Sequence, residues 1–168
     1  MVGIEPSAIL GFRDEFPALV EPTLRSDANR IARHVYLFEE WFMREVDAGR
    51  ISKDAFTTNP KTIRIHGHCH QKALSSMVST KRALSFPLQY EARLIPSGCC
   101  GMAGSFGYEK EHYDLSMKIG DLVLFKKIRE MKDDEIVVAS GTSCRHQILD
   151  GTGKISYHPA EVLYEALI

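Results

Sequence analysis

The sequence of 168 residues lacks several features that would assign its class at once. It has no apolar run of about 18 residues, the length that a membrane-spanning helix needs. Its first residues, from Met1 to Pro6, lack the basic stretch and the apolar stretch of a secretory signal. Its 21 basic and 22 acidic residues leave a net charge of −1, which predicts no basic surface for DNA, RNA or an anionic membrane. We therefore expect neither a transmembrane segment nor a nucleic-acid partner.

Cysteine is also scarce, and the four present are Cys69, Cys99, Cys100 and Cys144. Four are too few for a disulfide scaffold in a chain of this size. Cys99 and Cys100 are neighbours, and a disulfide between adjacent residues requires strained geometry. The sequence also has no Asn-x-Ser/Thr glycosylation sequon. These absences favour a reducing compartment, the cytoplasm, with the cysteines acting as thiols, catalysts or metal ligands.

Hydrophobic residues are plentiful by contrast, at 44% of the chain, and their spacing predicts alternating strands and helices. Short apolar runs predict strands over residues 62–66, 92–95, 136–139 and 155–157. Helical spacing predicts helices over residues 71–84, 108–131 and 159–167. Residues expected on the inward face of the second helix are Leu115, Ile119, Leu122 and Phe125. This alternation predicts an α/β fold of three layers, with helices on both faces of a parallel or mostly parallel sheet.

The first 60 residues are less regular. Val2–Ile4 is a short apolar run, and residues 8–16 are expected to form a helix that ends at Pro17. Apolar residues three and four apart predict one long helix over residues 26–48. Residues 57–60 form a loop that gives the best boundary, so we expect two parts, residues 1–60 and residues 61–168.

All four cysteines lie just beyond the C-terminal ends of predicted strands, each preceded by a glycine. Cys69 follows the strand at 62–66, Cys99 and Cys100 follow the next, and Cys144 follows the third. Because the carboxyl ends of parallel strands share one edge, where ligands bind, the cysteine loops are expected to converge there. Four thiolates at one place repel one another unless a cation neutralises them. An iron–sulfur cluster is the expected occupant, with zinc as the alternative.

Glycine recurs at every third position around the cysteine pair, at Gly98, Gly101, Gly104 and Gly107. Without Cβ atoms, this backbone can approach a cluster closely and direct N–H groups at sulfur. The loop is expected to end at the start of the 108–131 helix, where the positive end of the helix dipole would favour an anionic cluster.

The histidines near the cysteines are expected to play a supporting role. In an extended segment His66, His68 and His70 point to one side and Cys69 points to the other. We therefore expect them to hydrogen-bond around the site or to face solvent rather than to bind metal. His146 follows Cys144 by two residues, and its role is left open between a ligand and a hydrogen-bond partner.

Other uses of the cysteines are weaker alternatives. A lone cysteine is usually a small buried hydrophobic residue, but this explains less well why all four follow glycines at strand ends. The run from Gly98 to Gly101 does not match the Gly-x-nucleophile-x-Gly turn of hydrolases. No Cys-x-x-Cys of a thiol oxidoreductase occurs. A bare thiol site that exchanges with disulfide substrates stays open as a third alternative.

Three segments resemble the cysteine-rich CCG domain: His66-Gly-His-Cys-His-Gln-Lys-Ala-Leu74, Ser97-Gly-Cys-Cys-Gly-Met-Ala-Gly-Ser-Phe-Gly107 and Gly141-Thr-Ser-Cys-Arg-His-Gln147. That family includes the B subunit of heterodisulfide reductase, the iron–sulfur subunit of glycolate oxidase and the C subunit of anaerobic glycerol-3-phosphate dehydrogenase. The nearest likeness is to the C-terminal region of bacterial FAD-linked D-lactate dehydrogenase-type oxidoreductases. The resemblance covers residues 61–168 as a complete C-terminal domain. Because Val2–Ser7 resembles the end of a preceding copy, it implies that residues 1–60 are the remnant of such a domain.

The resemblance implies an iron–sulfur-binding electron-transfer domain of an FAD-linked oxidoreductase of the D-lactate, glycolate or glycerol-3-phosphate dehydrogenase type. It implies Cys69, Cys99, Cys100 and Cys144 as ligands of a [4Fe–4S] cluster, with Gly98 and Gly101 in the cofactor-binding loop. FAD is expected in the full-length protein rather than in this chain, so no residue here is expected to be catalytic. The implied partners are a flavin-binding domain or subunit and an electron acceptor, in the cytoplasm or at the inner face of its membrane. A zinc-stabilised structural or docking module of the same oxidoreductase is the alternative.

Two positions depart from the fullest form of the motif. Gln147 stands where that form has a fifth cysteine, and Ala8 stands where preceding copies often have a cysteine. Four thiolates suffice for an ordinary [4Fe–4S] cluster or for zinc. The five-thiolate non-cubane cluster of the fullest form would lack one ligand here.

Overall fold

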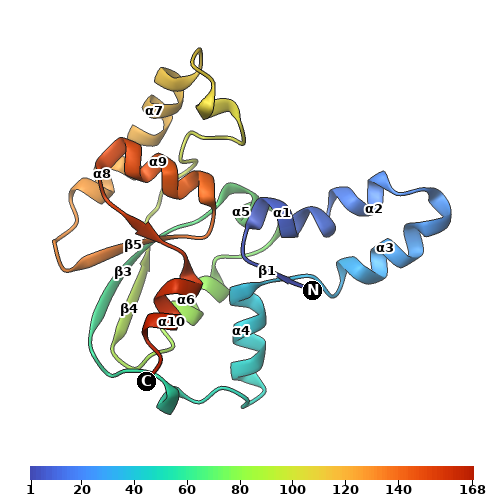
Figure 1. Cartoon of the computed structure of the whole chain (residues 1–168), viewed down its shortest axis with the longest axis horizontal. Helices are drawn as coiled ribbons and strands as arrows, with labels where there is room; N and C mark the ends of the chain where they lie inside the picture. Colours follow the sequence, from blue (N-terminus) through green and yellow to red (C-terminus); the bar gives the residue numbers. More distant parts are fainter.

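A computed structural model describes residues 1–168 and contains two parallel sheets joined in one α/β molecule (Figure 1). The larger sheet has the strand order β4-β3-β5-β6. Its strands are β3 (Lys61–His66), β4 (Tyr90–Leu94), β5 (Glu135–Ala139) and β6 (Ser156–Tyr157). Every neighbouring pair is parallel. The α/β class, the parallel sheet and all four predicted strand positions are therefore confirmed.

Helices fill the connections between these strands and cover the sheet on both faces. They are α5 (Cys69–Leu74), α6 (Val78–Leu84), α7 (Tyr113–Asp121), α8 (Leu124–Arg129), α9 (Thr142–Thr152) and α10 (Pro159–Glu165). In β5, Val138 packs in one apolar cluster while Val137 and Ala139 pack in another, because successive side chains of a strand point to opposite faces. The three-layer arrangement is therefore confirmed. None of these helices has the length and apolar composition required to cross a bilayer.

Residues 1–37 form an arm that extends to one side of the sheet (Figure 1). The second sheet pairs β1 (Val2–Gly3) with β2 (Tyr36–Leu37). Between them lie α1 (Pro6–Ile9), α2 (Glu15–Leu19) and α3 (Arg25–Ala32), with short 3-10 turns. The next helix, α4 (Phe38–Asp47), already packs on the large sheet, because Phe42 and Met43 belong to the apolar cluster of β3. The division of the chain into domains at residue 60 stays a prediction.

The single helix predicted over residues 26–48 is wrong. The chain leaves α3 at Ala32, runs as β2 beside Val2, and starts α4 at Phe38. At the break, the side chain of Glu40 accepts a hydrogen bond of 2.9 Å from the backbone N–H of Leu37 and so caps the new helix. Pairing with a strand from the chain start has overridden the helical spacing.

The helix predicted over residues 8–16 is also wrong. Helix α1 ends at Ile9, and Pro17 lies within α2 instead of ending a helix. Pro17 is the third residue of α2, where a backbone N–H would have no partner inside the helix in any case, so proline is tolerated there.

The helices predicted over residues 71–84 and 108–131 are each broken in two. Between α5 and α6, the side chain of Gln71 donates a hydrogen bond of 2.8 Å to Thr80, which holds the two helices together across the break. Between α7 and α8 the chain turns at Leu122, which is 70% exposed, and Leu115 is 51% exposed. The predicted inward face of this helix was therefore wrong at both leucines, although Phe125 is buried as expected.

Small residues, not leucines, form the buried face of α7. Ser116 and Gly120 are its buried residues. A Cβ on Gly120 would lie 2.3 Å from the ring of Phe125 and 2.7 Å from the carbonyl oxygen of Cys100. The ring and the cysteine loop therefore occupy the space that leucine side chains would need.

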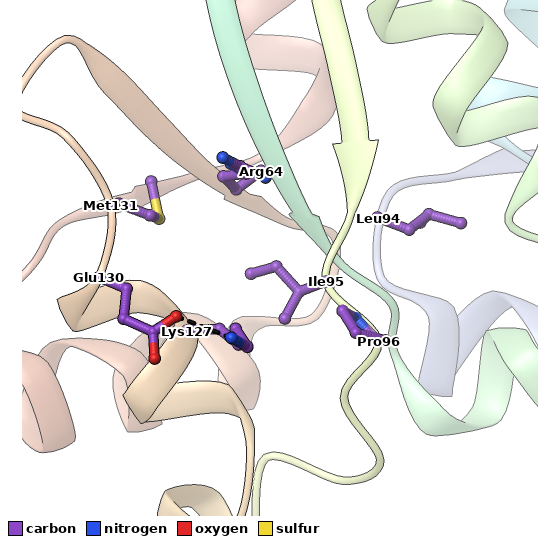
Figure 2. A pocket seen from close by; sticks show the side chains of 7 residues that line it. All are labelled: Arg64, Leu94, Ile95, Pro96, Lys127, Glu130 and Met131. Carbon is purple, nitrogen blue, oxygen red and sulfur yellow. Dashed lines mark hydrogen bonds and ion pairs between the residues drawn. The ribbon is translucent and has the colours of Figure 1, made fainter.

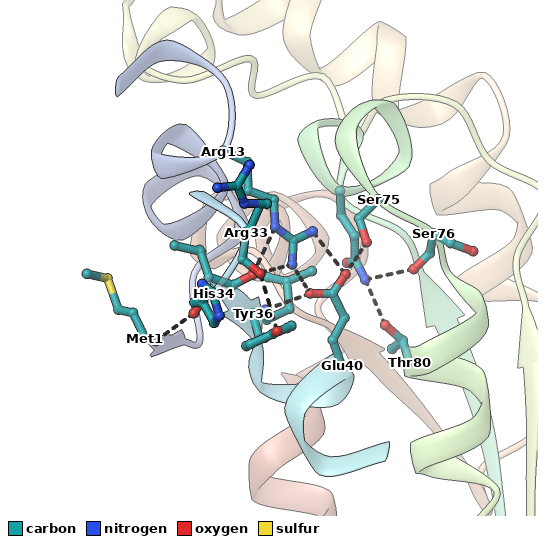
Figure 3. A network of polar contacts seen from close by, with 12 residues as sticks. Met1, Arg13, Arg33, His34, Tyr36, Glu40, Ser75, Ser76 and Thr80 are labelled. Atoms are coloured by element: carbon teal, nitrogen blue, oxygen red, sulfur yellow. Dashed lines mark hydrogen bonds and ion pairs between the residues drawn. The ribbon is translucent and has the colours of Figure 1, made fainter. Parts of the chain in front are cut away.

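Glu40 joins the arm to the large sheet through a polar network (Figure 3). Its carboxylate accepts hydrogen bonds from the Arg13 guanidinium, from Ser75 at the end of α5 and from Leu37. Arg13 also donates to the carbonyl oxygen of Val35 at 2.6 Å. Burial opposes ionisation of Glu40, but the hydrogen bonds from Arg13, Ser75 and Leu37 outweigh it and hold the pKa of that carboxyl below its usual range.

Replacing Glu40 with glutamine is expected to loosen the arm. Hydrogen bonds to charged groups contribute about 1.5–3 kcal/mol each, and the variant leaves Arg13 without its anion. We expect a loss of about 2 kcal/mol in the free energy of unfolding and faster amide hydrogen exchange in residues 1–37. Asp47→Asn is the matched control, because both partners of the Asp47–Arg82 pair are exposed and its loss should leave both measurements unchanged. Equal behaviour of the two variants would contradict this role of Glu40.

His158 connects the start of the chain to α10. Its Nε2 bonds the carbonyl oxygen of Ile4 at 2.8 Å, and its Nδ1 accepts the N–H of Ala160 at 3.0 Å. Both contacts fit a neutral ring that carries its proton on Nε2. Burial lowers the pKa of His158, with Glu39 raising it and Arg145 lowering it further.

Acid is therefore expected to destabilise the fold through His158. A depressed histidine pKa gives its full stabilisation above the unfolded value of about 6.5, and that stabilisation is lost as the pH falls toward the folded value. We expect the free energy of unfolding to fall below pH 6.5 by up to about 1.4 kcal/mol per pH unit from this group. Urea titrations at several pH values give the free energy of unfolding as a function of pH. Its decrease below pH 6.5 should be smaller in His158→Asn, in which asparagine can still cap α10. An identical decrease in the variant would assign the pH dependence to other groups.

Candidate metal centre

The four cysteines line one pocket at the carboxyl edge of the large sheet. Strands β3, β4 and β5 are adjacent and parallel, so the loops that follow them leave from the same edge. The pocket has a volume of about 280 Å³. It is lined by Cys69, Cys99, Cys100 and Cys144 together with Ser7, His68, His70, Ala103, Gly104 and Ser143. The convergence expected from the strand ends is present, although the cysteines are separated by up to half the chain.

The thiols form a continuous chain from the surface to the core. Cys69 is exposed, Cys99 is half-buried, and Cys100 and Cys144 are buried. All four are free thiols. Cys69 and Cys99, Cys99 and Cys100, and Cys100 and Cys144 lie close enough to influence each other's ionisation. The inner two sulfurs lie in an apolar cluster with Met102 and Ile148.

Protons are unevenly distributed along this chain of thiols. Hydrogen bonding from Cys100, together with His66 and His68 and against the effect of burial, lowers the pKa of Cys144 to about 5. Hydrogen bonds from Cys100 and Cys69 place the pKa of Cys99 far below that of an ordinary thiol. The pKa values of Cys69 and Cys100 are raised, because the neighbouring sulfurs of Cys99 and Cys144 favour the protonated thiol, and burial adds to this effect. The pocket therefore gathers negative charge that a cation would neutralise.

A helix N-terminus contributes to this electrostatic environment, but not the helix expected from the sequence. Cys144 is the third residue of α9, where the positive end of the helix dipole favours a thiolate. The chain after the cysteine pair instead passes through a 3-10 turn at Phe106–Tyr108, and α7 begins only at Tyr113.

The glycines of the loop have different roles. Gly101 has a φ of +100°, and a Cβ there would lie 2.1 Å from the carbonyl oxygen of Ser116. Its N–H donates to Cys99 Sγ at 3.3 Å. A Cβ built on Gly98 would have no neighbouring atom within 4 Å, so no contact requires glycine at this position. Gly101 therefore serves close packing against α7 as well as bonding to sulfur.

His66 points into the inner side of the site. It is 1% exposed, and its Nδ1 lies 2.8 Å from Ser97 Oγ. Its Nε2 is buried without a hydrogen-bond partner. A ring nitrogen of His66 and the Sγ atoms of Cys100 and Cys144 all lie within 4.8 Å of one another.

The other histidines are engaged differently. His68 Nδ1 accepts the N–H of His70 at 3.2 Å, and the two residues line the pocket near the start of α5. His146 Nδ1 lies 2.9 Å from the hydroxyl of Tyr108 and is outside the pocket lining, so it acts as a hydrogen-bond partner here.

Sequence reasoning missed two supports of the site that come from elsewhere in the chain. Glu5 accepts a hydrogen bond of 2.8 Å from the N–H of Thr142, the first residue of α9, and Ser7 lines the pocket. Burial opposes ionisation of Glu5, but hydrogen bonds from Thr142 and Ser7 outweigh it and lower the pKa of that carboxyl. Glu5 and Thr142 are 137 positions apart, so no local pattern could have paired them.

Two further side chains hold the loop of Cys99 and Cys100. Lys72 Nζ donates to the carbonyl oxygens of Ser97 at 3.1 Å and Gly98 at 2.7 Å. On the opposite side, Gln147 Nε2 donates to Ser116 Oγ at 2.7 Å, and that hydroxyl donates to the carbonyl oxygen of Gly101 at 2.9 Å. Gln147 therefore bonds to α7 and lies outside the pocket lining.

Another hollow of about 280 Å³ lies beside β3, the end of β4 and α8 (Figure 2). Its charged side chains are already paired. Arg64 Nη2 lies 2.6 Å from Glu135 Oε1, and Lys127 Nζ lies 2.7 Å from Glu130 Oε2. Its lining contains neither a thiol nor an imidazole. We therefore place the chemistry of the chain in the cysteine pocket.

The donor set of the cysteine pocket fits an iron–sulfur cluster or zinc. Its lining offers four sulfurs and the imidazoles of His68 and His70 and contains no carboxylate, and the buried imidazole of His66 lies beside Cys100 and Cys144. Thiolates favour these centres over magnesium or calcium, which prefer oxygen ligands.

Comparison with known proteins places similar sequences among dehydrogenases. No family model matches the chain. The chain is 28% identical to the C subunit of anaerobic glycerol-3-phosphate dehydrogenase of Escherichia coli K12, over 99% of this chain and 40% of that protein. It is 28% identical to D-2-hydroxyglutarate dehydrogenase of the same organism and 27% identical to that of Haemophilus influenzae, again over 99% of this chain. The alignments cover 15% and 16% of those two enzymes, so the chain spans less than half of each relative.

These similarities extend through residues 1–60 as well as the cysteine-bearing part, because almost the whole chain is aligned. They connect the chain to oxidoreductases, as expected from the sequence. Membership of the CCG family stays a prediction.

Proposed function

We propose that the chain is the electron-transfer domain of a larger oxidoreductase and holds a [4Fe–4S] cluster through Cys69, Cys99, Cys100 and Cys144. The observation that carries this proposal is the convergence of four free thiols on one pocket. Four cysteine thiolates are the usual ligand set of such a cluster. The similarity to one component of a dehydrogenase and to other dehydrogenases supports the oxidoreductase assignment.

Different residues of the pocket would hold the inner and the outer side of the centre. When bound, an iron–sulfur cluster accepts and releases single electrons. Cys100 and Cys144 anchor its inner side among apolar residues, which exclude water from that side. Cys69 is exposed and Cys99 is half-buried, so the outer side faces a partner. The N–H of Gly101 donates to Cys99 Sγ, a contact of the kind that adjusts the potential of a cluster.

We propose that electrons arrive from a flavin-binding domain or subunit and leave to a separate acceptor. The relatives are the C subunit of a glycerol-3-phosphate dehydrogenase and D-2-hydroxyglutarate dehydrogenases, which favours a small hydroxylated substrate oxidised elsewhere in the full protein. FAD belongs to that part in this proposal, and no residue of the present chain is assigned a catalytic role. The cytoplasm, or the inner face of its membrane through partners, is the proposed location. Residues 1–60 and 61–168 are proposed to belong to two successive cysteine-rich CCG-type domains.

Anaerobic reconstitution with iron and sulfide tests this function. We expect visible absorption that bleaches on reduction with dithionite and returns on oxidation, together with an electron paramagnetic resonance (EPR) signal in the reduced state. Ser105→Ala, in the same loop but exposed, is the matched control and should behave as the unaltered chain. A chain that takes up no cluster under these conditions would sink the proposal.

A zinc-stabilised docking module is the second candidate. The observation in its favour is the close grouping of a ring nitrogen of His66 with the sulfurs of Cys100 and Cys144, since structural zinc binds nitrogen and sulfur donors around a single ion. Elemental analysis of protein purified without added metal separates the candidates. About one zinc per chain with no iron and no sulfide would support this second function.

A further inference from the structure

We propose that His66 is a ligand of the metal centre through Nε2, as a fifth donor beside the four cysteines. This rests on the proposed function, because it requires a centre in the cysteine pocket. It departs from the sequence-based expectation that the histidines near Cys69 only hydrogen-bond or face solvent.

The position of His66 is fixed by the sheet. It is the last residue of β3, a central strand, and pairs in register with Ala139 of β5. Strand β4 runs along the other side of β3, and Ile95 donates its N–H to the carbonyl oxygen of Ile65. With 1% of its surface exposed, the side chain of His66 has no path to solvent.

The Nε2 atom of His66 lacks a hydrogen-bond partner in this buried position. A buried polar atom without a partner is costly, and native proteins keep few of them. A ring nitrogen of His66 lies within 4.8 Å of the Sγ atoms of Cys100 and Cys144, and Nε2 is the nitrogen that is not already bonded to Ser97. One metal centre can therefore reach this nitrogen and both inner sulfurs, and binding would satisfy the nitrogen.

Ser97 sets the tautomer that ligation requires. A metal-bound Nε2 carries no proton, so the proton of a neutral ring must lie on Nδ1. Ser97 Oγ lies 2.8 Å from Nδ1 and can accept that proton in a hydrogen bond. Metal-binding histidines commonly donate their second ring N–H to such a partner, which orients the ring.

The other candidates for a fifth donor are bonded elsewhere or, like His68 and His70 in the pocket lining, are only half-buried and within reach of water. Gln147 donates to Ser116, and His146 bonds Tyr108. His68 caps the start of α5 through its Nδ1. His66 is the one histidine with a ring nitrogen that is buried and without a partner.

Ligation by His66 predicts a specific electronic consequence. Neutral imidazole brings less negative charge than thiolate, and replacing cysteine by histidine ligands raises the reduction potential of an iron–sulfur centre. His66→Cys is therefore expected to lower the reduction potential. His70→Ala, which removes an imidazole from the same pocket, is the matched control and should leave it unchanged.

The direct test labels histidine with ¹⁵N and records electron–nuclear double resonance on the reduced, cluster-loaded chain. We expect the strong coupling of a directly bound nitrogen in the unaltered chain and in His70→Ala, and its loss in His66→Ala. A cluster-loaded chain with only the weak coupling of a hydrogen-bonded imidazole would overturn the assignment. So would a strong coupling that survives in His66→Ala.

The proposed function and this ligand fail in distinguishable ways. A chain that binds zinc instead of a cluster contradicts the function, and X-ray absorption at the zinc edge then tests the ligand. One nitrogen donor that disappears in His66→Ala would uphold His66 as a ligand of zinc, whereas a spectrum unaltered by that substitution would reject it. A chain that binds neither metal contradicts both proposals.

Discussion

Cys144→Ala is expected to abolish cluster binding while the chain stays folded. Cys144 is buried beside Cys100, His66 and the N-terminus of α9, so no other side chain can take its place on the inner side. Iron content after reconstitution should fall from about four atoms per chain to a tenth of that or less. Truncation of one sulfur costs about 1 kcal/mol in the free energy of unfolding, which leaves a folded chain.

Cys69→Ala is expected to lose less iron than Cys144→Ala. Cys69 is exposed at the outer rim, where water can occupy the vacated position. We expect this variant to keep part of its iron and to lose it faster in air, because one corner of the cluster is left open. Iron and sulfide analysis beside circular dichroism separates loss of the centre from loss of the fold. Full iron content in Cys144→Ala would show that the sulfurs of the inner side are not ligands.

Gly101→Ala is expected to have the largest effect on stability. The residue has a φ of +100°, which disfavours any side chain, and its Cβ would lie 2.1 Å from a backbone oxygen of α7. Backbone cannot move aside as a flexible side chain can, so α7 and the cysteine loop must separate. We expect a loss of about 3 kcal/mol or more, combining strain with overpacking.

Two neighbouring glycines give matched controls for Gly101. In Gly98→Ala the new Cβ has no neighbour within 4 Å, so the free energy of unfolding should change by less than about 0.5 kcal/mol. Gly104→Ala has open space but a φ of +69°, so it should cost about 1 kcal/mol from strain alone. Urea unfolding of the three variants measures this order. Equal midpoints for Gly98→Ala and Gly101→Ala would contradict the close approach of α7.

The large sheet and the place of the site could be predicted from the sequence because their signals are local. The apolar run at residues 136–139 marks a buried strand, and the glycine before each cysteine marks the turn that follows a strand. Parallel pairing then brings the three loops to one edge. This rule connects Cys69 with Cys144 without any knowledge of their contacts.

The helix boundaries could not be predicted, because contacts between distant segments decide them. Glu40 starts a new helix inside a continuous helical pattern, with Arg13 and Ser75 bonded to the same carboxylate. The apolar spacing favours Leu115 in α7 and Leu122 just after it as buried residues. The ring of Phe125 lies so close to α7, however, that only the small residues Ser116 and Gly120 are buried there. Hydrophobic spacing identifies a helix face but does not show how much space is left beside it.

The position of His66 beside Cys100 and Cys144 could not be predicted for a similar reason. Alternation along an extended chain would place Cys69 opposite the three histidines. Strand β3 ends at His66, however, and α5 begins at Cys69, so the alternation does not continue between them. The contact of Glu5 with Thr142 and that of His158 with Ile4 span 137 and 154 positions and leave no local trace in the sequence.

Iron and acid-labile sulfide per chain, measured on protein purified without exposure to oxygen, test the central claim most directly. We predict about four iron and four sulfide per chain in the unaltered protein, both lost together in Cys144→Ala and both retained in Ser105→Ala. One zinc per chain without sulfide, or iron that remains in Cys144→Ala, would contradict a four-cysteine iron–sulfur centre.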